Sequence, residues 1–227
     1  MSIKLKGSTD GSVTLQAPAD TSPTGTDKTL TLPTDVGSAN QFLQNGSTAG
    51  TLEFGALVSG DMPTGSILQV VQNHVTATTS QALTANTTTD ITNLSANITP
   101  LSATSDMLVF VMWHGELAHN PNNTVFGLKR GTTLIGQSAA SGSRAVGIAC
   151  MNMGYYGDDN ASTIDSAKYQ FFDTGRSSGT SQITYQATIR NSYNAGTTAY
   201  NNRTVSDVNA AGYERCASSV TIFEVAA

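Results

Sequence analysis

The chain has 227 residues and a formal net charge of -5; only 12% of its residues are charged, while about a quarter are serine or threonine. This balance excludes a nucleic-acid binder, which needs a basic face to neutralise phosphates, and a typical disordered chain, which combines low hydrophobicity with high charge. Thr, Val, Ile and Tyr favour pleated strands, and Gly, Asn and Asp favour turns. The composition therefore indicates an all-β protein.

Neither membrane insertion nor a disulfide framework is expected. The longest apolar run, Met107 to Trp113, is too short to cross a bilayer, and the N-terminal residues lack the apolar stretch of a secretory signal. Two cysteines, Cys150 and Cys216, are too few for a disulfide framework. The sequence favours two buried reduced thiols and leaves a single disulfide open.

Residues 1–60 contain short period-two pairs of apolar residues, separated by stretches rich in turn residues. Strands of two or three residues cannot bury a core within one chain, so this segment needs copies of itself or another surface. We predict that it attaches the protein to a larger particle and drives self-association. The candidate assembly residues are Ile3, Leu5, Val13, Leu15, Leu30, Leu32, Phe42, Leu52 and Phe54.

The stretch from Thr34 to Gly46 predicts a helix of about two turns. It begins with a Thr-Asp pair that suits an N-cap and ends in Asn-Gly, and its apolar residues are Val36, Ala39, Phe42 and Leu43. Residues 61–65, Asp-Met-Pro-Thr-Gly, are predicted to form a linker.

Residues 66–227 show longer strand patterns and no convincing helical periodicity. Ile183 to Arg190 alternates between apolar and polar residues, and Met107 to Trp113 is apolar at every position, which indicates a strand in the middle of a sandwich. About eight strands at this spacing predict a β-sandwich of jelly-roll type. The predicted strands are Ile67 to Val75, Ile91 to Ile98, Met107 to Leu117, Thr124 to Lys129, Ala145 to Met153, Lys168 to Phe172, Ile183 to Arg190 and Ser219 to Val225.

Several segments form a recognisable set: residues 7–18 (GSTDGSVTLQAP), 29–34 (TLTLPT), 34–46, 65–72 (GSILQVVQ) and 218–225 (SSVTIFEV). Together they resemble segments of tail-fibre and related structural proteins of marine bacteriophages. The resemblance implies a virion protein made in the bacterial cytoplasm of the host. It also implies a homotrimer whose N-terminal part docks on other virion proteins and whose C-terminal domain faces outward. Composition alone supports only the weaker statement that residues before Pro63 need a partner.

Few residues suggest chemistry. His114, Glu116 and His119 could ligate a metal, but the sequence favours polar residues that close a strand. Asp158, Asp159 and Asn160 with Asp165 could bind calcium weakly, and a solvated loop is favoured over that interpretation. Only four glutamates are present, and the fingerprints of hydrolases, P-loops and dinucleotide sites are missing. We therefore predict no enzymatic activity, no catalytic residues, no metal and no cofactor.

Tyrosines in predicted loops give a better indication of function. Tyr, Asn and Gly together form adaptable contact surfaces with a low ordering cost and suit recognition of a host-surface glycan or protein. The competing interpretation, which the sequence favours slightly, places these rings over sheet edges or subunit contacts. The candidate binding residues are Tyr155, Tyr156, Tyr193, Asn194, Tyr200, Asn201 and Arg203.

The sequence leaves a leading hypothesis, an alternative and a third, less favoured class of function. The leading hypothesis is a trimeric fibre that attaches a phage to its host. The alternative is a capsid decoration or cement protein, or a head fibre, that stabilises the phage head. A free carbohydrate-binding or hydrolytic protein is a third class, and it would have to act as a monomer.

Overall fold

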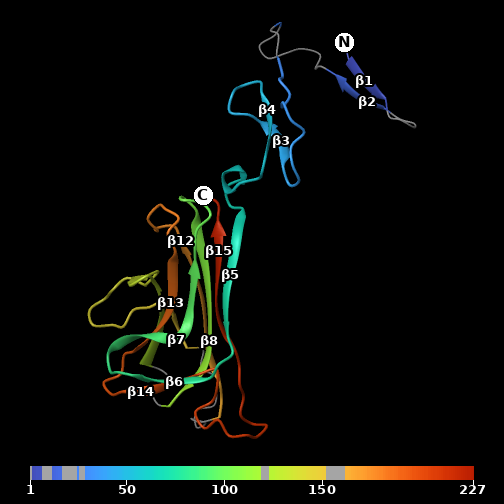
Figure 1. Cartoon of the computed structure of the whole chain (residues 1–227). Coiled ribbons are helices and arrows are strands. Elements are labelled where there is room, and N and C mark those ends of the chain that lie inside the picture. Colours follow the sequence, from blue (N-terminus) through green and yellow to red (C-terminus); the bar gives the residue numbers. More distant parts are fainter. Residues whose placement is uncertain (1, 7–11, 17–24, 26–28, 119–122, 152–161) are drawn as a thin grey trace. The chain divides into compact units, whose positions relative to one another are not determined.

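The computed structural model describes residues 2–6, 12–16, 25, 29–118, 123–151 and 162–227 (Figure 1). The chain divides into two compact units, unit 1 (Met1–Val58) and unit 2 (Ser59–Ala227). Within the described residues almost all regular structure is strand, and the helical exception is one three-residue 3-10 turn, η1 (Ser59–Asp61). The all-β prediction is confirmed. No helix in this part of the chain is long and apolar enough to span a bilayer.

Unit 1 contains two short antiparallel hairpins. The first pairs β1 (Ser2–Lys6) with β2 (Ser12–Gln16), and the second pairs β3 (Phe42–Asn45) with β4 (Leu52–Gly55). The register of the first hairpin sets Ile3 opposite Leu15 and Leu5 opposite Val13. The predicted apolar pairs at 3–5, 13–15 and 52–54 therefore lie in strands. The pair at 30–32 forms no strand, but its middle residue makes an isolated parallel bridge to residue 51.

The helix predicted from Thr34 to Gly46 is wrong. Asn40 has a φ of 65° and Gly37 a φ of 72°, both in the left-handed region that a right-handed helix cannot contain. A Cβ at Gly37 would lie 2.6 Å from Cγ of Phe54, so the backbone here packs directly on the ring of the hairpin strand β4. The apolar spacing comes from a turn followed by a strand, a pattern that a short helix shares.

Unit 2 is a sandwich of two antiparallel sheets over the residues that the structure describes. One sheet has the order β10-β9-β13-β7 with β11 beside β9, and the other has the order β5-β15-β8-β14-β6 with β12 on the free side of β8. The first sheet consists of β7 (Thr87–Ile98), β9 (Thr124–Arg130), β10 (Thr133–Ile135), β11 (Ala149–Cys150) and β13 (Ile183–Asn191). The second consists of β5 (Ile67–Val75), β6 (Thr79–Leu83), β8 (Asp106–Leu117), β12 (Asp165–Asp173), β14 (Thr197–Asn201) and β15 (Ser218–Val225).

The core lies between these two sheets. Along β8 the odd-numbered residues from Met107 to Trp113 are buried, as the period-two geometry of a strand requires. The indole of Trp113 packs against the ring of Phe126 on the other sheet, with 5.0 Å between the ring centroids. Tyr169 also joins the sheets, because its hydroxyl donates to the carbonyl of Gly127 at 2.7 Å. A β-sandwich is thus confirmed, and the jelly-roll subtype stays a prediction.

Most predicted strands of unit 2 are present, with one clear error. Residues 145–153 were expected to form a full strand, but only β11 pairs there, with Ala149 opposite Phe126, and residues 152 and 153 lie outside the described part. β6, β10 and β14 were not predicted: β6 and β14 are short and rich in polar residues, and β10 has only three residues.

Strand direction gives unit 2 two distinct ends. Val225 lies opposite Ile67, and the backbone of Ala226 exchanges hydrogen bonds with Gly65 and Ser66 at 2.7 and 2.9 Å. Residues 61–65, the expected linker, are therefore held at the end of the sandwich that also carries the C-terminus, here called the basal end (Figure 1). Loops 84–86 and 192–196 lie at the opposite, distal end, where Thr87 pairs with Asn191.

Candidate functional site

The side of the six-stranded sheet that faces away from the core carries apolar residues. Cross-strand pairing sets Val70 of β5 beside Phe223 of β15, Phe223 beside Leu108 of β8, and Leu108 beside Phe172 of β12. These four residues alternate with the core residues of their strands, so they form one row on the outer side. We call the outer surface made by Val70, Leu108, Phe110, Met112, Phe172 and Phe223 the apolar sheet face.

Aromatic side chains on this face are open to solvent. Phe172 is 45% exposed and Phe110 38%, and the aliphatic side chain of Val70 is 53% exposed beside them. Phe110 and Val70 lie in the central part of long strands, and Phe172 is the next-to-last residue of β12. Phe110 meets Phe223 edge to face, with ring centroids 5.6 Å apart and planes at 72°. Aromatic pairs of this kind normally contribute to a core or an interface rather than to a solvated surface.

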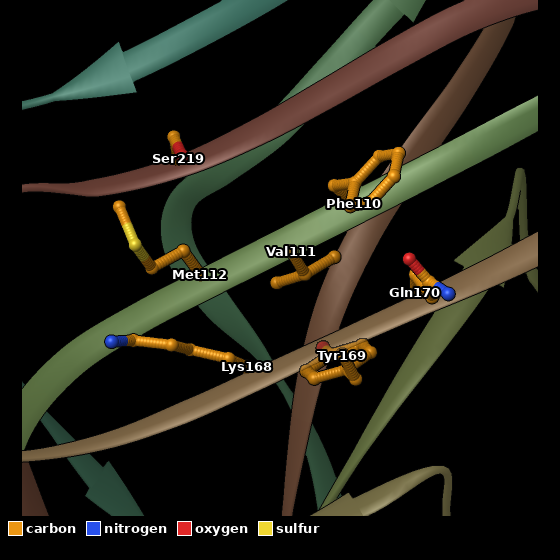
Figure 2. A pocket seen from close by; sticks show the side chains of 7 residues that line it. All are labelled: Phe110, Val111, Met112, Lys168, Tyr169, Gln170 and Ser219. Atoms are coloured by element: carbon orange, nitrogen blue, oxygen red, sulfur yellow. The ribbon is translucent and has the colours of Figure 1, made fainter.

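The apolar sheet face also contains a hollow of about 450 Å³, between β8, β12 and β15. Figure 2 shows Phe110 and Gln170 on one side of it and Met112 and Lys168 on the other. Ser219 lies beside Met112 in the register, and its short side chain leaves room that a larger residue would fill.

Charge is sparse on this side of the sandwich. Lys168 is opposite Met112, and Asp106 begins β8 at the basal end. His114, on the same side, has a lowered pKa, first because burial disfavours the imidazolium and second because Lys168 repels it. Both effects favour the neutral imidazole over the imidazolium.

The outer side of the other sheet is polar by contrast. There the ammonium of Lys129 contacts the carboxylate of Asp90 at 2.5 Å, and the hydroxyl of Thr184 donates to the side chain of Asn97 at 2.7 Å. The two outer surfaces of one sandwich thus differ in kind. The apolar sheet face is a specific feature and not the general surface composition of unit 2.

Unit 1 exposes apolar side chains as well. Of the predicted assembly residues, Leu30, Leu32 and Phe42 are exposed, the latter two by 68% and 60%, while Leu52 and Phe54 are half-buried within the second hairpin. For Ile3, Leu5, Val13 and Leu15 the structure gives the backbone pairing described above. Four further large apolar residues of this unit are also exposed: Val36, Leu43, Leu57 and Val58.

The predicted binding residues fall into separate places. Tyr193 and Asn194 are exposed in the distal loop between β13 and β14, as expected. The prediction of an exposed loop at Tyr200 and Asn201 is wrong, because both residues belong to β14. Asn201 is buried, and its side-chain oxygen accepts a hydrogen bond from the indole of Trp113 at 2.7 Å. Tyr155 and Tyr156 lie outside the described residues.

Arg203 is half-buried and begins a long loop, residues 203–217, that leaves the sheet beside His114. Its guanidinium lies 4.5 Å from the ring centroid of Tyr200 and donates to two carbonyls of the loop. Farther along, Arg215 and Asp207 form an ion pair at 2.8 Å, next to a surface hollow of about 430 Å³ that Tyr213 also lines. Arg203 therefore shapes the base of this loop.

The residues considered for metal binding do not converge in the described part of the chain. Glu116 is buried, and one of its carboxylate oxygens accepts the backbone N–H of Val205 at 2.6 Å, whereas His119 and residues 158–160 lie outside that part. No group of three metal-binding side chains occurs among the described residues. Cys150 and Cys216 are exposed and form no disulfide, so the expectation of buried thiols is wrong.

Sequence reasoning missed the apolar sheet face. The run from Met107 to Trp113 was predicted to be a strand in the middle of the sandwich because it is apolar at every position, and that pattern did not reveal that its even-numbered residues face outward. A signal was available in β12 and β15, where Phe172 and Phe223 occupy the positions that alternate with the core.

Comparisons with known proteins leave the family open. No family model matches the chain, and no curated protein matches it. One similar solved structure is described as "Structure of infectious bursal disease virus Gt strain"; it is 14% identical, with a TM-score of 0.30, over 82% of this chain and 41% of that chain. The chain therefore spans less than half the length of that viral chain. A TM-score at this level carries no conclusion about fold or function.

Proposed function

We propose that the protein is a non-enzymatic structural component of a bacteriophage particle, a homotrimeric fibre that attaches the particle to the host surface. The observation that carries this proposal is the exposed apolar surface of unit 1. Several large apolar side chains of this unit are open to solvent, and large exposed apolar surfaces on soluble proteins mark contacts with other proteins. The resemblance of several segments to phage fibre proteins supports the same class.

Unit 1 is proposed to attach to other virion proteins and to associate with its own copies. Its hairpins have strands of four or five residues, and an isolated two-stranded hairpin is at best marginally stable in water. Leu32, Val36 and Phe42 are among the side chains that remain open in the single chain. Contact with neighbouring copies or with the particle would remove these side chains from water.

Unit 2 is proposed to be the head that contacts a glycan or protein of the host. Tyr193 and Asn194 in the distal loop, with the loop at 203–217, offer phenol, amide and guanidinium groups on a rigid sandwich. Weak contacts from three heads would add through multivalency, because the second and third heads bind at a high effective concentration.

The alternative function is a capsid decoration or cement protein, or a head fibre. The same exposed apolar surface would then clamp capsid subunits instead of completing a fibre. Imaging of labelled particles separates the two, since a fibre protein would be found at the tail or neck and a decoration protein in many copies over the head.

Light scattering on the purified full-length chain tests the proposal. We expect a molecular mass of about three times 23.6 kDa. A stable monomer at micromolar concentration would contradict the proposed assembly role, and a dimer would contradict the trimer.

A further inference from the structure

The apolar sheet face combines an exposed aromatic side chain, Phe172, with a hollow. Phe172 lies in the row with Leu108, whereas the hollow is lined by Phe110, Met112 and Lys168 in the next two rows. Phe172 and Lys168 are four residues apart on β12, so the ring and the far edge of the hollow are separated by about 13 Å along the strand.

We propose that the apolar sheet face is the contact between the sandwiches of neighbouring copies of this chain, and that an exposed aromatic side chain of one copy enters the hollow of the next. This inference rests on the proposed self-association and specifies where unit 2 takes part in it. The trimer proposed above requires a heterologous contact, in which the ring of each copy enters the hollow of the next; in a dimer the same two features would meet twice across a two-fold axis. A heterologous contact can close into a ring such as a trimer.

The composition of the apolar sheet face matches the core of a protein interface. Phenylalanine and methionine are enriched in such cores and charged residues are depleted, which describes the six residues that define this surface. A lipid surface fits less well, because interfacial binding uses several basic residues around the apolar part, and Lys168 is the cation that lines the hollow.

The size of this surface also suits a second copy. β5 has nine residues, which corresponds to about 30 Å at 3.3 Å per residue, and four neighbouring strands span about 19 Å. The outer side of these four strands, polar positions such as Gln72 and Gln170 included, covers on the order of 600 Å² before the relief of the side chains is added, compared with about 800 Å² per partner in a standard interface. In a closed ring each copy contacts two neighbours, so the area that each copy buries is the sum of two contacts.

Photo-crosslinking of the full-length protein tests the inference. Gln170 lines the hollow and is exposed, so p-benzoylphenylalanine introduced at this position would face the incoming side chain. Irradiation is expected to produce covalent dimers, and peptide mapping is expected to place the linkage on β5, β8, β12 or β15 of the other copy. The same photoreactive residue at Thr133, exposed on β10 of the other sheet, is the control and should produce few dimers.

The outcomes separate this inference from the proposed function. A mass near three chains without crosslinks from position 170, or with crosslinks to another surface, would overturn the interface while leaving the assembly intact. A monomeric mass would overturn both. As a second measurement, Phe172→Asp is expected to raise the dissociation constant of the assembly at least tenfold, while Thr133→Asp leaves it unchanged; equal effects would also count against the interface.

Discussion

Glu224 is the most informative single residue for stability. Its carboxylate is fully buried in β15, where a charge is costly unless hydrogen bonds compensate it. The backbone N–H groups of Leu101 and Ser102 donate to it at 2.9 and 3.0 Å, as do the hydroxyl of Ser105 at 2.5 Å and the amide of Gln69 at 2.6 Å. The carboxylate thereby ties the loop at residues 99–105 to the last strand.

Arg176 extends this network at the basal end. Its guanidinium donates to the hydroxyl of Ser105 at 2.9 Å and also to the carbonyls of Ser102 and Ser105. The hydroxyl of Ser105 therefore links the guanidinium of Arg176 to the carboxylate of Glu224, since it accepts a hydrogen bond from the first and donates one to the second. A buried network in which the polar groups are satisfied gives a rigid and specific arrangement.

The network predicts a pH-dependent effect of the substitution Glu224→Gln. Burial alone raises the pKa of Glu224, but the hydrogen bonds to Leu101, Ser105, Gln69 and Ser102 outweigh it and hold the pKa below the ordinary value of a glutamate. The ionised form therefore stabilises the fold above that ordinary value, and this contribution is lost as the pH falls through the folded-state pKa. Urea denaturation should show a loss of about 1–3 kcal/mol at pH 7 and a smaller loss at pH 3.

Glu214→Gln is the matched control for this measurement, because Glu214 is exposed in the loop that precedes β15. It should change the free energy of unfolding little at either pH. Equal losses for Glu224→Gln at pH 7 and pH 3 would show that the ionised carboxylate contributes nothing.

At the scale of the elements, Gly115 decides how β14 joins the six-stranded sheet. Asn201 pairs with Gly115, and the indole of Trp113 donates to the side chain of Asn201 at the same place. A Cβ at Gly115 would collide with the carbonyl oxygen of Tyr200 and would lie 2.6 Å from Cζ2 of Trp113. The backbone of Tyr200 and the indole of Trp113 thus occupy the space that a Cβ at position 115 would need.

Gly115→Val is predicted to push β14 away from β8. Overpacking of a filled site costs about 1–3 kcal/mol, which urea denaturation would measure as a lower free energy of unfolding. The chain contains one tryptophan, so a red shift of its emission would report separately that the indole has become accessible to water. Gly60→Ala serves as the control, because a Cβ there meets nothing within 4 Å. An unshifted spectrum with wild-type stability would contradict the close packing.

The elements also show what could be predicted from the sequence and why. The strand at Ile183 to Arg190 was recognised because one side of β13 faces the core and the other faces away from it, which imposes an alternation of apolar and polar residues. β14 was missed because it ends in buried amides: Asn201 accepts from Trp113, and Asn202, the residue after the strand, donates to the carbonyls of Val75 and Ala77 at 2.9 Å. Buried asparagines of this kind look like loop residues in a sequence.

The candidate site was harder to predict than the fold. The need of residues 1–60 for a partner followed from strand length, and exposed side chains such as Leu32 and Phe42 agree with it. The apolar sheet face depends on which side of a sheet each strand presents, and on the pairing of β5, β15, β8 and β12, which are far apart in the chain. Local patterns contain no information on that pairing.

At the scale of the whole molecule, both units expose apolar surface, and the self-association proposed above would link folding to association. Association of folded copies stabilises them by mass action, since unfolded chains do not associate in the same way. The consequence is a dependence of thermal stability on protein concentration. A monomer of the same sequence would have a melting temperature that does not change on dilution.

Thermal unfolding over a hundredfold range of concentration is therefore the last test. For a trimer that dissociates as it unfolds, this dilution lowers the free energy of unfolding per chain by about 1.8 kcal/mol, which corresponds to a Tm lower by about 4–7 °C in a chain of this length. Rescanning of each sample checks that the transition is reversible, because an irreversible transition reports a rate instead of an equilibrium. A Tm that stays constant over the whole range would mean that the exposed apolar side chains of Leu32, Phe42 and Phe172 remain in water in the folded protein, and self-association would then have no part in its stability.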